Sequence, residues 1–146
     1  MATVNGCNLP EDLHYLVDRH VWCREEGGVV TVGVTDVAQS LAKTIIAVTP
    51  KKLGKSVAKG QSLATVESGK WVGPVPSPVN GEIVEVNQAV VGEPSTINRD
   101  PYGEGWVVKL RASDWAADSA DLATGPDGIE VYRRFLESEG IACGEG

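Results

Sequence analysis

The chain has 146 residues, enough for one domain with a modest core. Its formal net charge of -7 disfavours nucleic acid and anionic membranes as partners, because a negative surface repels phosphate groups. No apolar run approaches the roughly 20 residues of a membrane span, and the start of the chain lacks the basic and apolar regions of a secretory signal, so we expect a cytoplasmic protein that binds proteins or small molecules.

The cysteines Cys7, Cys23 and Cys143 are an odd number without the spacing of metal ligands. They therefore predict neither a complete disulfide framework nor a zinc site, and we expect reduced thiols. A redox role for Cys23 or Cys143 is an open alternative, because the reactivity of a thiolate depends on local electrostatics.

The first third of the chain predicts strands. Residues 1–12 have the composition of a loose lead-in. Residues 13–24 mix aromatic and β-branched residues, which indicates two short strands broken near residues 18–19. Residues 29–34 predict another strand, in which Gly33 marks a bulge or a close approach of another group.

A short helix is predicted next, over residues 37–42. Asp36 precedes it as the expected N-cap, and Gln39 stands three positions on, in the manner of a capping box. Residues 44–48 return to a strand.

The middle of the chain, from residue 51 to 105, is rich in glycine and proline and has few helix signals. Short runs between these residues fit strands of four to seven residues. Many short strands at close spacing predict a small barrel or sandwich. The runs are "SLATVES" (62–68), "GEIVEVN" (81–87) and "GWVVKL" (105–110).

Helices are predicted at the C-terminal end. Ser113 can cap a helix in "SDWAADSADL", and residues 125–140 form a stronger candidate with Pro126 in the first turn and Gly140 at the end. Its apolar stripe is expected to pack on the barrel, with a protein-docking helix as the alternative. The stripe consists of Ile129, Tyr132, Phe135 and Leu136.

Lys70 lies in the bend "ESGK" between two predicted strands, where its amine projects away from the backbone. A lysine in a polar turn is ordinarily a solvated charge. A catalytic lysine needs a desolvated pocket that lowers its pKa, so an exposed tip favours a lysine that is chemically modified. Acylation would convert it into a long mobile arm.

From His20 to about Ser113 the chain resembles the H protein of the glycine cleavage system, a carrier whose lysine bears lipoic acid. The resemblance is carried by "HVWCREEGGVVTVGVTDVAQSL", by "VESGK" and by "INRDPYGEGWVVKL". It implies that Lys70 is the lipoyl attachment site. It also implies that Glu67 and Gly81 are recognised by the attaching enzyme, a lipoate ligase or transferase.

The fold implied by the resemblance is mainly β: a lipoyl/biotinyl-type flattened barrel-sandwich of two small antiparallel sheets with short flanking helices. We expect an N-terminal lead-in (1–12), a lipoyl-type domain (13–112) and a C-terminal helical segment packed on it (113–146). Gly60 and Gly81 are expected in tight turns, and Trp106 and Val108 are expected in the core.

The chain also departs from the family pattern. Trp71 follows the lysine, Pro74 and Pro76 stiffen the returning strand, Val21 stands where the family has an acidic residue, and Cys23 follows the "HVW" element. These features resemble the H-protein-like lipoate-binding proteins of bacterial sulfur oxidation. The partners implied are a heterodisulfide-reductase-like complex and dihydrolipoamide dehydrogenase.

We therefore expect a carrier and not an enzyme, with sulfur intermediates as the first choice of cargo. The alternative is an aminomethyl group passed between the P, T and L proteins of glycine cleavage. An unmodified scaffold is a further alternative, and a biotin carrier is disfavoured because "ESGK" lacks the methionines of that family. Gly69, Trp71 and His20 are candidate contacts of the arm, and a partly buried structural histidine is the equal alternative for His20. Gly69 is expected to be required for attachment if the bend needs a positive φ there.

Overall fold

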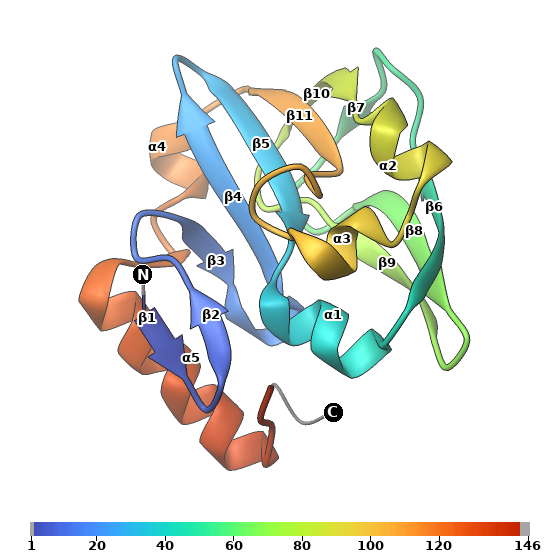
Figure 1. Ribbon diagram of the computed structural model, residues 1–146. Helices are drawn as coiled ribbons and strands as arrows, with labels where there is room; N and C mark the ends of the chain where they lie inside the picture. Colours follow the sequence, from blue (N-terminus) through green and yellow to red (C-terminus); the bar gives the residue numbers. More distant parts are fainter. Residues whose placement is uncertain (1, 144–146) are drawn as a thin grey trace.

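The computed structural model describes residues 2–143, and strands dominate it (Figure 1). All paired strands are antiparallel, as expected. The large sheet has seven strands in the spatial order β12 (Ala123–Thr124), β3 (His14–Leu16), β4 (Val21–Glu26), β5 (Val29–Val34), β11 (Val108–Ala112), β10 (Gly81–Val86) and β7 (Ser56–Val57). The smaller sheets are β6 (Ile45–Pro50), β8 (Ser62–Ser68) and β9 (Val72–Pro76), and β1 (Ala2–Val4) with β2 (Cys7–Leu9).

Short helices flank the sheets, and one longer helix follows them. In the described residues, no helix is both long and apolar enough to cross a membrane. The helices are the 3-10 turn η1 (Val17–Arg19), α1 (Asp36–Ala42), α2 (Gln88–Gly92), α3 (Thr96–Arg99), α4 (Trp115–Asp118) and α5 (Gly125–Glu139).

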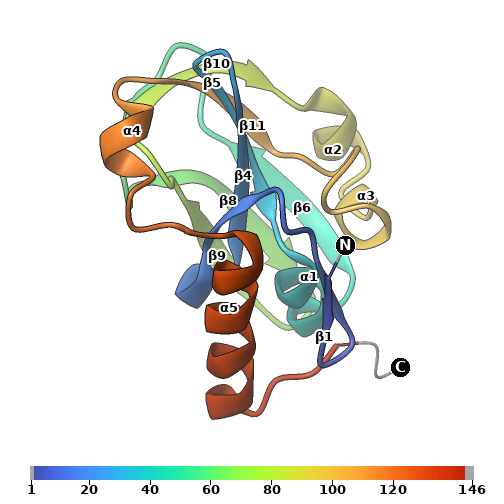
Figure 2. The same ribbon diagram turned by 90° about the vertical axis from the view of Figure 1, so that its left-hand side faces the viewer.

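Two apolar cores share strand β4, because successive side chains of a strand point to opposite faces. Val21 and Cys23 belong to the core between the seven-stranded and three-stranded sheets. Trp22, between them, belongs to a second core under α5 and the β1–β2 hairpin. Figure 2 shows α5 beside that hairpin, outside the barrel. The predicted stripe of α5 is buried at Ile129, Tyr132 and Leu136 and half-buried at Phe135, and it packs in the second core and not on the barrel core.

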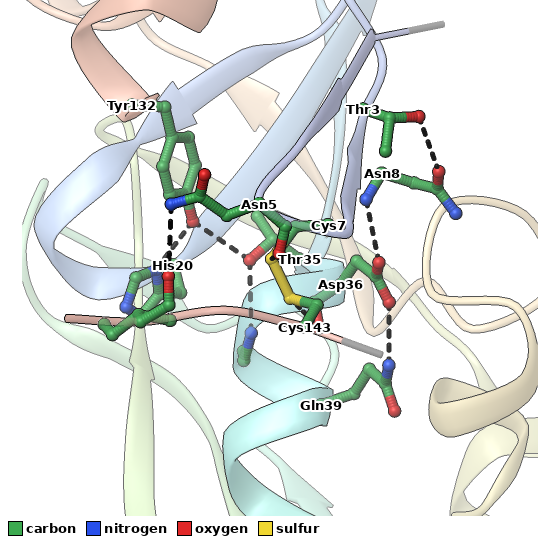
Figure 3. Close-up of a disulfide and its surroundings, with 12 residues drawn as sticks. Thr3, Asn5, Cys7, Asn8, His20, Thr35, Asp36, Gln39, Tyr132 and Cys143 are labelled. Atoms are coloured by element: carbon green, nitrogen blue, oxygen red, sulfur yellow. Dashed lines mark hydrogen bonds between the residues drawn. A yellow bond between two sulfur atoms is a disulfide. The ribbon is translucent and has the colours of Figure 1, made fainter. Parts of the chain in front are cut away.

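The N-terminal residues are more ordered than the loose lead-in that we expected. Residues 2–9 form a hairpin whose Cys7 and Leu9 are fully buried. Cys7 forms a disulfide with Cys143 across a sequence separation of 136 residues (Figure 3). The expectation of reduced thiols is therefore wrong for these two cysteines, because folding brings the two ends of the chain together.

Two helix caps differ from the prediction by one residue. Thr35, and not Asp36, caps α1, since its Oγ1 accepts a hydrogen bond from the Ala38 amide at 3.3 Å. The Asp36 carboxylate accepts from the Asn8 amide instead, which ties α1 to the first hairpin. Asp114, and not Ser113, caps α4.

Gly140 ends α5 in the left-handed conformation, as predicted. Gly33 is also confirmed as a close approach, because a Cβ there would lie 2.7 Å from the Trp22 ring. Gly60 has the positive φ of a tight turn, at 91°. Gly81 does not: it begins β10, where a Cβ would lie 2.6 Å from the carbonyl oxygen of Arg111. Close packing of two strands, and not a turn, requires glycine there.

The predicted strand at residues 105–110 begins only at Val108. Gly105 is still part of the preceding turn, because its amide donates to the carbonyl of Asp100 at 2.8 Å. Val108 is fully buried, as expected, whereas Trp106 is half-buried and packs against the second core.

Candidate functional site

Lys70 lies at the tip of the β8–β9 hairpin, which projects at the edge of the molecule (Figure 1). The tip is closed by the Ser68 amide, which donates to the carbonyl oxygen of Trp71 at 2.7 Å. The Ser68 hydroxyl also accepts from the Lys70 amide at 3.2 Å. The backbone of Lys70 is thus held in place while its side chain remains exposed.

Two of the other predicted residues share this tip. Glu67 is exposed near the end of β8, opposite Val72. Gly69 is exposed as well, and a Cβ there would meet no atom within 4 Å. Its φ is not positive, so our expectation for Gly69 is wrong. The hydrogen bonds of Ser68 close the bend with ordinary backbone angles.

A groove of about 530 Å³ opens beside Lys70. One wall of the groove is apolar and comes from α1. Another wall comes from β9, and polar side chains enter from η1 (Asp18 and Arg19) and from its C-cap, His20. The groove is therefore mainly apolar, and Lys70 lies at its edge. It is lined by Asp18, Arg19, His20, Val21, Val34, Ala38, Leu41, Ala42, Ile45, Val66, Lys70, Trp71, Val72, Gly73, Pro74 and Val75.

Trp71 forms part of the groove wall next to Lys70. Its side chain is about half exposed, and its ring lies directly against Gly73. A Cβ on Gly73 would lie 2.2 Å from the Cζ2 atom of this ring, closer than any real contact. Glycine at this position therefore provides the space in which the indole rests.

His20 lines the same groove from the end of η1, where its backbone is left-handed with φ 57°. Its Nδ1 atom lies 2.6 Å from the Tyr132 hydroxyl, and its ring stacks on the Tyr132 ring at 5.7 Å between centroids. Burial lowers the pKa of His20 to about 4, although the Asp18 carboxylate acts in the opposite direction. The imidazole is thus neutral at neutral pH.

The structure brings Lys70, Trp71 and His20 together around one groove, and it leaves Gly81 apart. Gly81 is buried in the seven-stranded sheet, whereas Lys70 belongs to the three-stranded one. Gly81 presents no surface at the lysine tip.

Sequence reasoning missed the α1 wall of the groove. Ala38, Leu41 and Ala42 follow the three- and four-residue spacing of one helix face, and this pattern was a usable signal. It also missed Tyr132 as a partner of His20, for which the sequence carries no signal, because the two residues are 112 positions apart.

The remaining cysteine, Cys23, is buried in the barrel core. Burial raises the pKa of its thiol to about 12, and the positive charge of Lys59 acts in the opposite direction. A protonated, enclosed thiol is a poor nucleophile, which disfavours a redox role for Cys23. Within residues 2–143 no cluster of three or more histidine, cysteine or acidic side chains could hold a metal ion.

Comparison with known proteins gives one consistent family. The family model described as glycine cleavage H-protein matches residues 13–135. "Glycine cleavage system H protein 5" of Aquifex aeolicus is 47% identical over 148 residues, which covers 99% of this chain and 100% of the relative. "Probable glycine cleavage system H protein 2" of Sulfolobus acidocaldarius is 41% identical, covering 98% of this chain and 97% of the relative.

A solved structure shows the same fold. The crystal structure of a glycine cleavage system H protein from Mycobacterium marinum superimposes with a TM-score of 0.75 at 32% sequence identity. The match covers 91% of this chain and 100% of that one.

Proposed function

Because the chain belongs to the glycine cleavage H-protein family, we propose that it is a lipoyl carrier whose arm is attached at Lys70. The observation that carries this proposal is the exposed Lys70 at a hairpin tip, directly beside an apolar groove. Attachment joins the deprotonated lysine Nζ to the carboxyl carbon of a lipoyl group activated by the attaching enzyme: the amide bond forms as the bond to the activating group breaks, and the positive charge of the lysine is lost. When bound, the lipoyl group supplies a dithiolane that opens and closes by thiol–disulfide exchange.

The lining of the groove fits such an arm. Leu41, Trp71 and Val75 offer apolar surface to a hydrocarbon chain, and an indole also makes favourable contacts with sulfur. His20 and Asp18 provide polar groups in the same groove. The groove can therefore shelter the arm between visits to partner enzymes.

The surface around the tip fits a partner protein. Leu41, Ile46, Trp71 and Val72 are large hydrophobic residues that are each about half exposed or more. Ile46 stands in a bulge of β6, between the pairs Ile45↔Ser68 and Ala47↔Glu67. We assign this surface, together with Glu67, to the lipoate-attaching enzyme, which must reach Lys70.

Gly81 stays a prediction as a recognition residue. Its burial favours an indirect role, in which it keeps β10 close to β11 and so preserves the domain that the enzyme recognises. A cytoplasmic location also stays a prediction, and the Cys7–Cys143 disulfide is unusual for a reducing compartment.

For the cargo, the names of the relatives support an aminomethyl group and the P, T and L proteins of glycine cleavage as partners. This reverses the order of our sequence analysis, which placed sulfur intermediates first. The Asp18 carboxylate in the groove also suits a cationic amine.

A sulfur cargo, carried for a heterodisulfide-reductase-like complex, is the second candidate. It is favoured by Trp71 and Pro74, which make the wall next to the lysine apolar and polarizable.

The group that the lipoyl arm takes up distinguishes the two cargoes. Oxidised lipoylated protein is offered glycine with glycine decarboxylase, or dihydrolipoyl protein, whose thiolate can attack the donor, is offered a sulfane sulfur donor, and the intact mass is measured. Gain of an aminomethyl group supports the first cargo, and sulfur gained without aminomethyl loading supports the second.

The attachment itself is tested by co-expression with a lipoate ligase and measurement of the intact mass. We expect the mass of one lipoyl group in the native protein and none in Lys70→Arg, because arginine cannot form the amide. Lys55→Arg, at another exposed lysine, is the matched control and should be lipoylated normally. An unmodified native protein would favour the scaffold alternative instead.

A further inference from the structure

The hydroxyl of Tyr132 connects α5 to the groove. It lies 2.6 Å from Nδ1 of His20 and 3.1 Å from Oγ1 of Thr35 (Figure 3). Tyr132 and Thr35 are fully buried and do not line the groove, whereas His20 does. The Tyr132 hydroxyl thus meets the groove through the histidine, whereas Thr35 also caps α1, whose Ala38 lines the groove.

The donors and acceptors of this chain can be assigned by counting hydrogens. Oγ1 of Thr35 already accepts from the Ala38 amide, and its own hydrogen needs an acceptor because the side chain is fully buried. Among residues 2–143, the acceptor in hydrogen-bond distance is the Tyr132 oxygen. Thr35 therefore donates to Tyr132, and the single hydrogen of Tyr132 is left to donate to Nδ1 of His20. A neutral imidazole that accepts at Nδ1 carries its hydrogen on Nε2.

We propose that Thr35 and Tyr132 are positioning residues that hold His20 as its Nε2–H tautomer, so that it presents one hydrogen-bond donor to the arm in the groove. The inference rests on the proposed function at Lys70. The group recognised is a hydrogen-bond acceptor of the arm, either the amide carbonyl next to Lys70 or a sulfur of the dithiolane.

The surroundings of His20 favour a fixed donor. Its ring stacks on Tyr132 and meets Phe135 edge-on, which restricts its rotation. Its carbonyl accepts from the Thr35 amide at 3.0 Å, which holds the left-handed backbone in place. In the part of the chain that the structure describes, no residue forms a hydrogen bond with Nε2. That nitrogen is available to a ligand.

Nitrogen-15 NMR of the histidine side chains tests the inference directly. The chain has two histidines, so His14 serves as an internal control in every spectrum. We expect the unmodified native protein to show His20 with its hydrogen on Nε2, and Tyr132→Phe to show a mixture of tautomers. Tyr15→Phe is the matched control, because Tyr15 is equally buried but donates to the Pro10 carbonyl. Thr35→Ser keeps the hydroxyl and should retain the native tautomer.

Modification of Lys70 supplies the second readout. Lipoylation is expected to shift the Nε2 resonance of His20 and to leave that of His14 unchanged. Octanoylated protein has the same amide without sulfur: a shift there assigns the acceptor to the carbonyl, and a shift with lipoate alone assigns it to sulfur.

Three results would overturn the inference: hydrogen on Nδ1 in the native protein, an unchanged tautomer in folded Tyr132→Phe, or no shift of His20 on modification. The native tautomer needs no variant, so the test stands even if Tyr132→Phe does not fold. Absence of the modification by mass spectrometry would refute the proposed function separately, because the tautomer is read from the unmodified protein.

Discussion

Two glycines near Lys70 differ in what a side chain would meet. A Cβ on Gly69 would meet open space, whereas a Cβ on Gly73 would collide with the ring of Trp71. Since neither residue needs a positive φ, the contact with Trp71 is the difference that matters. The position of the indole is thus set by the backbone two residues further on.

We therefore expect Gly73→Ala to displace the Trp71 ring and Gly69→Ala to leave it in place. Acrylamide quenching of tryptophan fluorescence should rise in Gly73→Ala, and the free energy of unfolding should fall by about 1 kcal/mol. Gly69→Ala is the control and should match the native protein in both measurements. In a Trp71→Phe background, Gly73→Ala should no longer change the quenching. Equal quenching of the two glycine variants would contradict this contact.

His20 makes the stability depend on pH. Burial lowers its pKa in the folded protein to about 4, below the ordinary 6.5, so the unfolded chain binds more protons between these values. The stabilising contribution is present above pH 6.5 and is lost as the pH falls toward 4. It amounts to about 3 kcal/mol.

Urea unfolding between pH 4 and 7 measures this contribution. The slope of stability against pH should be shallower in His20→Asn, because asparagine does not titrate and tolerates the left-handed backbone. His14→Asn is the comparison variant, and it should lose less of the slope, because His14 is less buried than His20. Identical slopes in the native protein and His20→Asn would refute the assignment.

At the scale of elements, the bulge in β6 turns an apolar side chain toward solvent beside the lysine tip. Ile46 has no partner in the ladder with β8, and it is 55% exposed. Bulges commonly redirect a side chain in this way near functional sites. The element thereby contributes to the surface that we assign to the attaching enzyme.

Ile46→Asp should reduce kcat/KM of lipoylation by about tenfold, or about 1.4 kcal/mol. A charge at this position would have to be desolvated when the enzyme binds. The control is Leu53→Asp, since Leu53 is 66% exposed but follows the opposite end of β6. Equal rates for the two variants would remove Ile46 from the interface.

At the scale of the whole molecule, the disulfide between Cys7 and Cys143 closes almost the full length of the chain. It joins the β1–β2 hairpin to the segment after α5, and the Cys143 amide also donates to the Asn5 carbonyl at 2.8 Å. The hairpin and α5 share the second core. The division into a lead-in (1–12), a lipoyl-type domain (13–112) and a C-terminal segment (113–146) stays a prediction.

Cys7→Ser with Cys143→Ser should lower the free energy of unfolding by about 2 to 5 kcal/mol, because the unfolded chain gains the freedom of a long open loop. Denaturant unfolding measures the loss. Reduction of the native protein should give a similar value. Cys23→Ala is the control: it keeps the disulfide and should lose about as much stability on reduction as the native protein does. Equal stability of oxidised and reduced protein would contradict the expected role.

How far the sequence predicts this protein depends on the range of the interaction concerned. Most strands, helix α5 and the exposed tip at Lys70 follow from local patterns, because alternation, caps and turn residues act over a few positions. The predicted N-caps differ from the observed ones by one position, because both neighbours are acceptable cap residues in each case: Thr35 and Asp36 at α1, and Ser113 and Asp114 at α4. The prediction of a positive φ at Gly69 was wrong because hydrogen bonds of Ser68 close the turn with ordinary backbone angles.

The sequence by itself thus determined the family, the mainly β fold and the exposure of Lys70, because short sequence motifs are enough to predict each of them. Tertiary structure alone decided the groove, the contact of Trp71 with Gly73, the His20–Tyr132 pair and the Cys7–Cys143 disulfide. The physical reason is that side chains across the groove and at the chain ends become neighbours only when sheets and helices pack. Their geometry depends on that packing, which no local pattern encodes.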